Sequence, residues 1–477
     1  MRKNLVIVLA AVAMVATAAC GASGGDAEKA GGGEEGASTT TTAATSEAAA
    51  GTYGDLEGVC GAGDATVKDG EGGGATDQLN IGVATDRTST IRPGLNKEMW
   101  DASVAFSEWC NAQGGVKGLK INLVELPGAL LEVESAMSTA CTGVFAMVGG
   151  GFAQDNFEFS GKDGSDFHKC GLIDIPGYAV SPEKSDSNGQ VQPVPNPATS
   201  VATTWMRDYE ALNPDLAGKI AIAYASLPAL EIVKDKYVAG AEDVGLDVVD
   251  TFSFPATGQS DWTPMAQRII DSGATTLLWV GEAGFAASLI GTLKQQGWTG
   301  KALLETNMYD PLLFSAGDDA VEGTVLRQTA HPLEEADRWP AIQQYLDTLD
   351  EYVPDAKTGP LGVQATSAWL LFAVAAGKCA EAGDGVIDRT CVLQQADAIA
   401  EWNGGGLHAT VDPASGATAT AGECGMLMVV KDGKFERLYP KLDGKGDDGD
   451  GFHCPKDGVA EVPANAGKGK VDPSRPI

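Results

Sequence analysis

The chain has 477 residues, of which 65 are acidic and 33 basic, and its formal net charge is −32. This length predicts two or three domains, and an apolar fraction of 43% excludes a wholly disordered protein. The negative charge excludes nucleic acid and electrostatic docking on anionic lipid, because both partners need a basic surface.

The N-terminus has the pattern of an export signal. Arg2 and Lys3 precede an apolar run, residues 5–19, interrupted only by Thr17. The run is shorter than the roughly 20 residues of a membrane-spanning helix and fits a secretory signal. It ends in ATAACG (residues 16–21), which resembles the lipobox of bacterial lipoproteins and implies cleavage after residue 19 and a lipid on Cys20. An ordinary secretory signal is the alternative, and no later stretch is predicted to be long and apolar enough to span a membrane.

A low-complexity segment follows. Residues 21–52 are mostly Gly, Ala, Ser and Thr, which cannot bury enough apolar surface to order themselves. We therefore assign residues 20–77 to the lipidated cysteine and a flexible tether. Such an anchor would hold a folded body outside the cell membrane without crossing it.

Eight further cysteines remain, an even number that suggests disulfides in an exported protein. Sequence alone cannot choose among the 105 possible pairings, but nearest neighbours favour 60–110, 141–170, 379–391 and 424–454. One reduced pair is the alternative. The candidate disulfide cysteines are Cys60, Cys110, Cys141, Cys170, Cys379, Cys391, Cys424 and Cys454.

From residue 79 onward strands alternate with helices, which predicts parallel sheets covered by helices on both faces. The first unit is predicted to contain strands at 79–84, 120–124, 144–148 and 173–178 and helices at 95–109 and 132–142. The second unit is predicted to contain strands at 219–224, 248–254, 275–280 and 302–306 and helices at 202–212, 229–244, 262–272 and 285–296.

After residue 330 helices are predicted at 336–352, 361–378 and 392–402, with a late strand at 425–430 and a turn at 431–434. These helices lack the strands for a third sheet, so we expect them to return to the first unit. The resulting assignment is lobe 1 at 78–200 plus 331–410, lobe 2 at 201–330 plus 411–440, and an irregular tail at 441–477.

Catalytic signatures are not evident. A literal G-x-S-x-G at 21–25 lies in the tether rather than on a strand-to-helix turn. The glycines at 149–151 lack the rest of a dinucleotide fingerprint, and no P-loop is present. The four histidines are isolated in the sequence at His168, His331, His408 and His453. We therefore expect no catalytic residues, no metal and no cofactor.

Three segments resemble type I periplasmic solute-binding proteins, which include the leucine/isoleucine/valine-binding proteins of ABC importers. The stretch FSEWCNAQGGVKGLKI (106–121) is similar to the end of the first helix and the second strand of that family. The stretch SDWTP (260–264) is similar to the start of a helix in the second lobe of the family. The stretch VGG (148–150) is similar to the end of a strand that precedes a ligand loop. The resemblance covers residues 79 to about 440. It implies an α/β fold of two lobes joined by a hinge of three crossovers.

The ligand of such a fold lies in the cleft beyond the C-terminal ends of the strands. This places the site in six loops, at 85–88, 150–154 and 177–181 in lobe 1 and at 224–227, 281–282 and 307–309 in lobe 2. The candidate ligand-binding residues are Thr85, Asp86, Arg87, Thr88, Gly151, Phe152, Ala153, Gln154, Tyr178, Ala179, Ser181, Tyr224, Ser226, Leu227, Gly281, Glu282, Asn307, Met308 and Tyr309.

Several of these residues have an alternative interpretation. Phe152, Tyr178, Tyr224 and Tyr309 could fill the core at strand ends, and Arg87 could pair with a surface carboxylate. The amino-acid binders of the family carry a Ser or an Ala-x-Thr clamp, whereas the loops here read GGFAQ and GYAVS. This departure speaks against an amino acid, and aromatic-rich loops would suit a larger, less polar solute.

The resemblance implies a monomeric lipoprotein that binds a small molecule (an amino acid, an amide, or a larger apolar or aromatic compound) and delivers it to an ABC transporter permease. The alternative is a ligand-sensing receptor with the same fold that is not coupled to transport. An extracellular enzyme is a third hypothesis, which no sequence feature supports.

Overall fold

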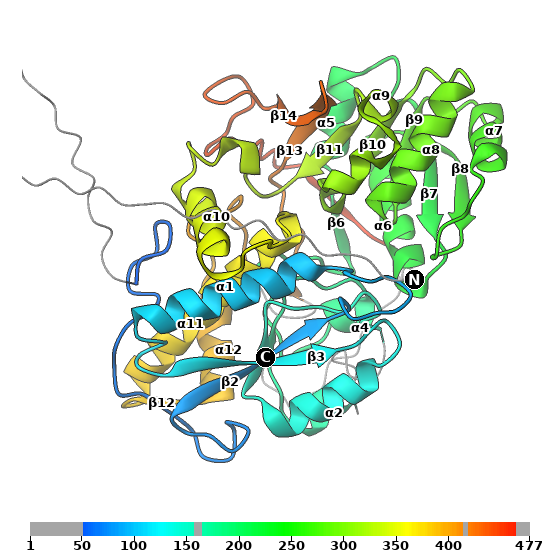
Figure 1. The fold of residues 1–477 in the computed structure, drawn as a ribbon. Helices are drawn as coiled ribbons and strands as arrows, with labels where there is room; N and C mark the ends of the chain where they lie inside the picture. The colour runs from blue at the N-terminus through cyan, green and yellow to red at the C-terminus, as the bar shows by residue number, and fades with distance from the viewer. Residues whose placement is uncertain (1–50, 157–164, 414–417, 464–477) are drawn as a thin grey trace, which may run out of the picture. The chain divides into compact units, whose positions relative to one another are not determined.

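The chain divides into two units, Met1–Glu47 and Ala48–Ile477. The computed structural model describes residues 51–156, 165–413 and 418–463, all of them in the second unit (Figure 1). The predicted signal segment and Cys20 lie outside the described residues. The α/β class with mainly parallel sheets and flanking helices is confirmed, and the two larger sheets define the two lobes.

Lobe 1 is built on a four-stranded parallel sheet with the strand order β3-β2-β4-β5. Its predicted strand at 173–178 is reduced to β5. In chain order its elements are β2 (Gln78–Thr85), α1 (Lys97–Gln113), β3 (Lys120–Pro127), α2 (Val133–Gly143), β4 (Ala146–Val148), α3 (Asp166–Lys169), β5 (Asp174–Ile175), α4 (Pro182–Ser185), α10 (Pro340–Tyr352), α11 (Pro360–Ala382) and α12 (Arg389–Asp397).

Lobe 2 is built on a seven-stranded sheet with the order β14-β13-β11-β10-β9-β7-β8, in which β13 runs antiparallel to its two neighbours, β11 and β14, and the other pairs are parallel. The strands β11 and β14 were not predicted. The elements are β7 (Lys219–Ala225), β8 (Asp247–Phe254), β9 (Thr276–Val280), β10 (Lys301–Leu304), β11 (Val325–Gln328), β13 (Met426–Lys431), β14 (Lys434–Tyr439), α5 (Thr204–Leu212), α6 (Pro228–Val244), α7 (Thr263–Asp271), α8 (Ala283–Gln295), α9 (Asp318–Val321) and the 3-10 turns η1 (Thr306–Met308), η2 (Pro311–Ala316) and η3 (Leu333–Glu335).

Each sheet has an apolar core on both of its faces, as a parallel sheet requires. In lobe 1 one core contains residues of α1, α10, α11 and α12, and the other contains residues of α2. Figure 1 shows α1 and α11 side by side. Helix α11 is long and apolar enough to cross a membrane, which corrects the expectation that no such stretch follows the signal. Its apolar window is 83% buried inside the lobe, so it serves here as a core helix.

The chain passes between the lobes three times. It leaves lobe 1 after α4, returns between β11 and α10, and enters lobe 2 again between α12 and β13. The second and third crossovers lie next to each other, because Ala330 and His408 form an antiparallel bridge. This connectivity is the hinge of three crossovers that the family resemblance implied.

Residues 51–77 are folded, in contrast to the flexible tether expected there. Tyr53 is 1% exposed and lies edge-on to Trp109 of α1, with ring centroids 5.2 Å apart. Strand β1 (Thr66–Val67) pairs with β12 (Val386–Ile387). The segment lacks long apolar runs, and single large side chains separated by glycines attach it to lobe 1.

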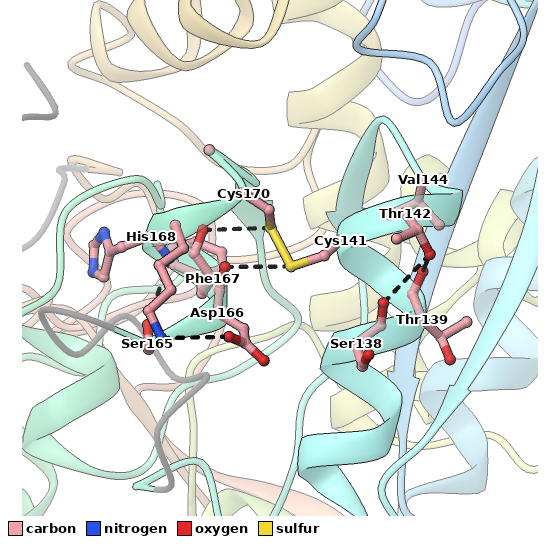
Figure 2. Close-up of a disulfide and its surroundings, with 12 residues drawn as sticks. Ser138, Thr139, Cys141, Thr142, Val144, Ser165, Asp166, Phe167, His168 and Cys170 are labelled. Carbon is pink, nitrogen blue, oxygen red and sulfur yellow. Dashed lines mark hydrogen bonds and ion pairs between the residues drawn. A yellow bond between two sulfur atoms is a disulfide. The ribbon is translucent and has the colours of Figure 1, made fainter.

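Part of the expected irregular tail is also ordered. Strand β15 (Val459–Glu461) pairs with β6 (Ser200–Ala202), and Phe452 is buried in the core of lobe 2. The structure contains the four disulfides that nearest-neighbour spacing favoured, namely Cys60–Cys110, Cys141–Cys170, Cys379–Cys391 and Cys424–Cys454. Figure 2 shows that the second of them links α2 to the residue after α3.

Candidate functional site

A cavity of about 490 Å³ lies where the strands of both sheets end. In both lobes the first strand, β2 or β7, has its second strand on one side and its third on the other. Crevices form beyond the C-terminal ends of parallel strands at such switch points. Lining residues follow β2, β3, β4 and β5 in lobe 1 and β7, β8, β9 and β10 in lobe 2, as the topology requires.

Most of the wall is apolar. Ile91 and Leu131 of lobe 1 are 47% and 68% exposed, so both apolar side chains also reach solvent. The apolar lining residues with large side chains are Ile91, Leu95, Leu130, Leu131, Val180, Val194, Pro195, Val201, Leu227, Leu230, Val233, Val280, Leu361 and Val411. A volume and lining of this kind are typical of sites for small organic molecules.

Eight of the nineteen candidate ligand-binding residues line this cavity. They come from five of the six predicted loops, and they are Ala153, Gln154, Tyr178, Ala179, Leu227, Gly281, Glu282 and Asn307. The structure does not bring the other eleven into the cavity lining. These are Thr85, Asp86, Arg87, Thr88, Gly151, Phe152, Ser181, Tyr224, Ser226, Met308 and Tyr309.

The segment after β2 lines the cavity with Ile91, Arg92, Leu95 and Asn96, which follow the predicted residues 85–88. Thr85 and Asp86 are fully buried, and Thr88 is exposed. The Asp86 carboxylate accepts hydrogen bonds from the backbone N–H groups of Leu130 (2.8 Å) and Ala153 (2.7 Å), so it supports two lining residues from behind. Burial raises the pKa of Asp86.

Other candidates are held by neighbours inside their own lobes. Arg87 pairs with Glu125 at 2.6 Å, as its alternative interpretation proposed. Ser181 caps α4 by accepting from the Lys184 N–H, and Ser226 is exposed. Tyr224 lies under the Lys234 ammonium, 5.5 Å from the ring centroid.

The remaining candidates fill cores because their backbone turns them inward. Phe152, next to Gly151, is buried among apolar residues of α2. Met308 ends the 3-10 turn η1 and is 1% exposed. Tyr309 packs edge-on against Phe435, and its hydroxyl bonds the Glu334 carboxylate.

Two polar pairs of the cavity lie at the ends of β2, β5 and β9. Arg92 of lobe 1 forms an ion pair with Glu282 of lobe 2 (Nη2 to Oε2, 2.7 Å), although burial raises the pKa of Glu282. The Asn96 amide donates to the Tyr178 hydroxyl at 2.8 Å. A ligand in the cavity can therefore contact charged groups of both lobes.

A second polar cluster in lobe 2 was not predicted from the sequence. The Tyr237 hydroxyl donates to Glu305, whose other carboxylate oxygen lies 3.2 Å from Arg327 Nε. The neighbouring Lys236 is 4% exposed, and its ammonium donates to Asn196 Oδ1 and to the Pro197 carbonyl, both at 2.7 Å. The signal available in the sequence was a lysine within the apolar face of a helix.

His408 adds a neutral polar group to the wall. Its Nδ1 donates to the Ala409 carbonyl and its Nε2 accepts from the Ser367 hydroxyl, both at 2.7 Å. Burial lowers the pKa of His408 to about 4, so the ring is uncharged near neutral pH. Within the described residues, no group of three or more His, Cys, Asp or Glu is placed to hold a metal ion.

The sequence matches the family model described as periplasmic binding protein over residues 78–434. A fatty acid ABC transporter substrate-binding protein from Thermomonospora curvata is similar in structure, with a TM-score of 0.64 and 18% identity over 83% of this chain and 94% of that chain. A branched-chain amino acid ABC transporter protein from Thermus thermophilus with bound valine has a TM-score of 0.62 and 16% identity, covering 76% and 95%.

A solute-binding protein of an ABC transporter from Rhodopseudomonas palustris, in complex with 4-hydroxybenzoate, has a TM-score of 0.59 and 18% identity over 76% of this chain and 96% of that chain. No curated protein sequence matches. At these identities the likeness to the solved structures concerns the fold.

Proposed function

The chain belongs to the periplasmic binding protein family, and on that premise we propose that it is an extracytoplasmic solute-binding protein that delivers a small molecule to an ABC importer. The observation that carries the proposal is the cavity of about 490 Å³ between the strand ends of both lobes. Charged groups from both lobes reach it, so a bound solute would favour the closed arrangement of a hinged protein.

We further propose that the body of the solute is largely apolar. The cavity wall is formed mainly by aliphatic side chains. Ser181, in the loop after β5, caps α4 and does not line the cavity, and neither that loop nor GGFAQ after β4 contains an Ala-x-Thr clamp. Among proteins of similar fold, one is described as a fatty acid transporter protein and another contains 4-hydroxybenzoate. Both solutes are less polar than a free amino acid.

The protein is held at the outer face of the membrane by a lipid on Cys20 in the same proposal. The lipobox-like sequence before Cys20 supports this anchor. Because residues 51–77 are folded, the tether would be shorter than residues 20–77. The body would then comprise lobe 1 at 78–200 plus 331–410 and lobe 2 at 201–330 plus 411–440, with residues 51–77 attached to lobe 1.

Uptake by cells tests the transport function. Deletion of the gene should abolish uptake of one class of radiolabelled solute, and the wild-type gene should restore it. Cys20→Ala protein should be released into the medium and should lose incorporation of labelled palmitate. Normal uptake of every solute that binds the purified protein would contradict a transport role and would favour the sensing alternative.

A further inference from the structure

Lys236 of α6 is a buried cation at the wall of the cavity. Its side chain is 4% exposed, and its two hydrogen-bond acceptors, Asn196 Oδ1 and the Pro197 carbonyl, are uncharged. Among the described residues, none has a carboxylate within ion-pairing distance of its ammonium. This is unexpected in a protein with 65 acidic and 33 basic residues, because buried charges are normally paired.

The other charges of the cavity are already paired. In the described part of the chain, the lining contains three cations and two carboxylates. Arg92 pairs with Glu282, and Arg327 pairs with Glu305. One positive charge therefore remains, and it belongs to Lys236.

Apolar lining residues lie beside Lys236 and its partner Asn196. Leu230 and Val233 precede Lys236 by six and three residues in α6, and Val194 and Pro195 lie next to Asn196 in the first crossover. A ligand group that reaches the ammonium must therefore bring an aliphatic or aromatic body with it. A free amino acid fits poorly, because neither carboxylate of the lining is available for its ammonium group.

We propose that the solute is an amphipathic monocarboxylate whose carboxylate pairs with the Lys236 ammonium while its apolar body occupies the rest of the cavity. This inference rests on the proposed solute-binding function and names its substrate class. A single negative charge on the ligand neutralises the lining, and a charged hydrogen bond to a buried lysine gives it orientation.

The electrostatics of the site agree with this assignment. Burial, with Arg327 nearby, lowers the pKa of Lys236 to about 7, and Glu305 and Asp186 offset this only in part. A bound carboxylate would stabilise the protonated amine and raise that pKa again. The uncharged His408 contributes no competing cation near neutral pH.

Calorimetric titration of the purified full-length protein with matched pairs of probes tests the inference. The probes are octanoate with octanamide and decanoate with decanamide, at pH 6.5, where the amine is mainly protonated. Hydrogen bonds to charged groups contribute about 1.5–3 kcal/mol. Wild-type protein should therefore bind each carboxylate about ten- to a hundredfold more tightly than its amide.

Three variants separate charge from structure. Lys236→Met should reduce carboxylate affinity about ten- to a hundredfold and leave amide affinity within about twofold. Lys236→Gln retains donors for Asn196 and Pro197 without the charge, and it should lose the same preference. Lys234→Met is the matched control, because Lys234 pairs with Asp235 outside the cavity lining and should keep wild-type preference.

The outcomes distinguish this inference from the function on which it rests. Equal binding of carboxylate and amide by wild-type protein would overturn the monocarboxylate assignment and leave solute binding intact. A carboxylate preference that survives in the folded Lys236→Gln protein would assign the anion to another residue. Failure of wild-type protein to bind these probes or any member of a broad solute library would overturn the proposed function as well.

Discussion

Replacing Asp86 with alanine should both destabilise the protein and loosen one wall of the cavity. The fully buried carboxylate accepts from the backbone N–H groups of Leu130 and Ala153 at 2.8 and 2.7 Å. Ala129 and Leu130 have φ values of 46° and 70°, in the left-handed region that side chains other than glycine rarely adopt. Asp86 thus holds a strained loop whose residues Leu130 and Leu131 line the cavity.

The size of the expected loss of stability follows from the two backbone N–H groups that lose their acceptor. A buried donor without a partner costs about 1–3 kcal/mol, but removing a buried carboxylate returns part of that cost because burial disfavours its charge. We therefore expect Asp86→Ala to lower the free energy of unfolding by about 2–4 kcal/mol. The raised pKa of Asp86 shows that the fold disfavours its charged form, so the neutral Asp86→Asn, which keeps an acceptor, should cost about half as much.

Urea unfolding measures the free energy of unfolding, and titration with octanoate measures whether the cavity wall still binds the probe with the same affinity. Asp86→Ala should weaken octanoate binding several-fold, because the loop relaxes and withdraws Leu130. Glu381→Ala is the control, because its ion pair with Lys117, also at 2.7 Å, is exposed to solvent and should contribute little to stability. A loss below about 1 kcal/mol in Asp86→Ala, together with unchanged affinity, would refute the role assigned to this carboxylate.

Three further predictions concern separate parts of the molecule. Tyr53→Ala should destabilise the protein by about 3–5 kcal/mol in urea unfolding, whereas a flexible segment would show almost no change. Removal of the Cys60–Cys110 disulfide, which spans 50 residues, should cost about 4 kcal/mol by the chain-entropy relation, and unchanged stability would contradict the link. Octanoate affinity should fall about tenfold per pH unit above pH 7, where the free protein loses the Lys236 proton, and the decline should be absent from Lys236→Met.

The alternation of strands and helices was predictable because it depends on local pattern. Strands such as β7 are continuous apolar runs, and α1 ends at Gln113, directly before Gly114, whose φ of 118° suits glycine. Residues 51–77 were assigned to the tether for the opposite reason. Their order comes from one disulfide and a few buried side chains, such as Tyr53, which a composition window does not register.

The loops of the site were predictable, but the direction of their side chains was not. Strand ends follow from topology, so Glu282 and Asn307 were found. Whether Tyr178 faces the ligand or Tyr309 faces the core depends on one turn of backbone after the strand. The position of Lys236 in the apolar face of a helix was visible in the sequence, but its role was not. That role depends on Asn196, 40 residues away, and on the absence of an ion-pairing carboxylate among the described residues.

Two ion pairs join the two lobes beside the cavity. Arg92 and Glu282 come from different lobes, and Lys357 of lobe 1 lies 2.8 Å from Asp310 of lobe 2. If the lobes separate, both pairs must part, and Glu282 and Asp310 must find water instead. Contact between the lobes therefore pairs the charges at these positions, whereas Lys236 forms no ion pair with a carboxylate of the described residues. A ligand that supplies one carboxylate completes the pairing, and this gives it an advantage over a neutral solute of the same shape.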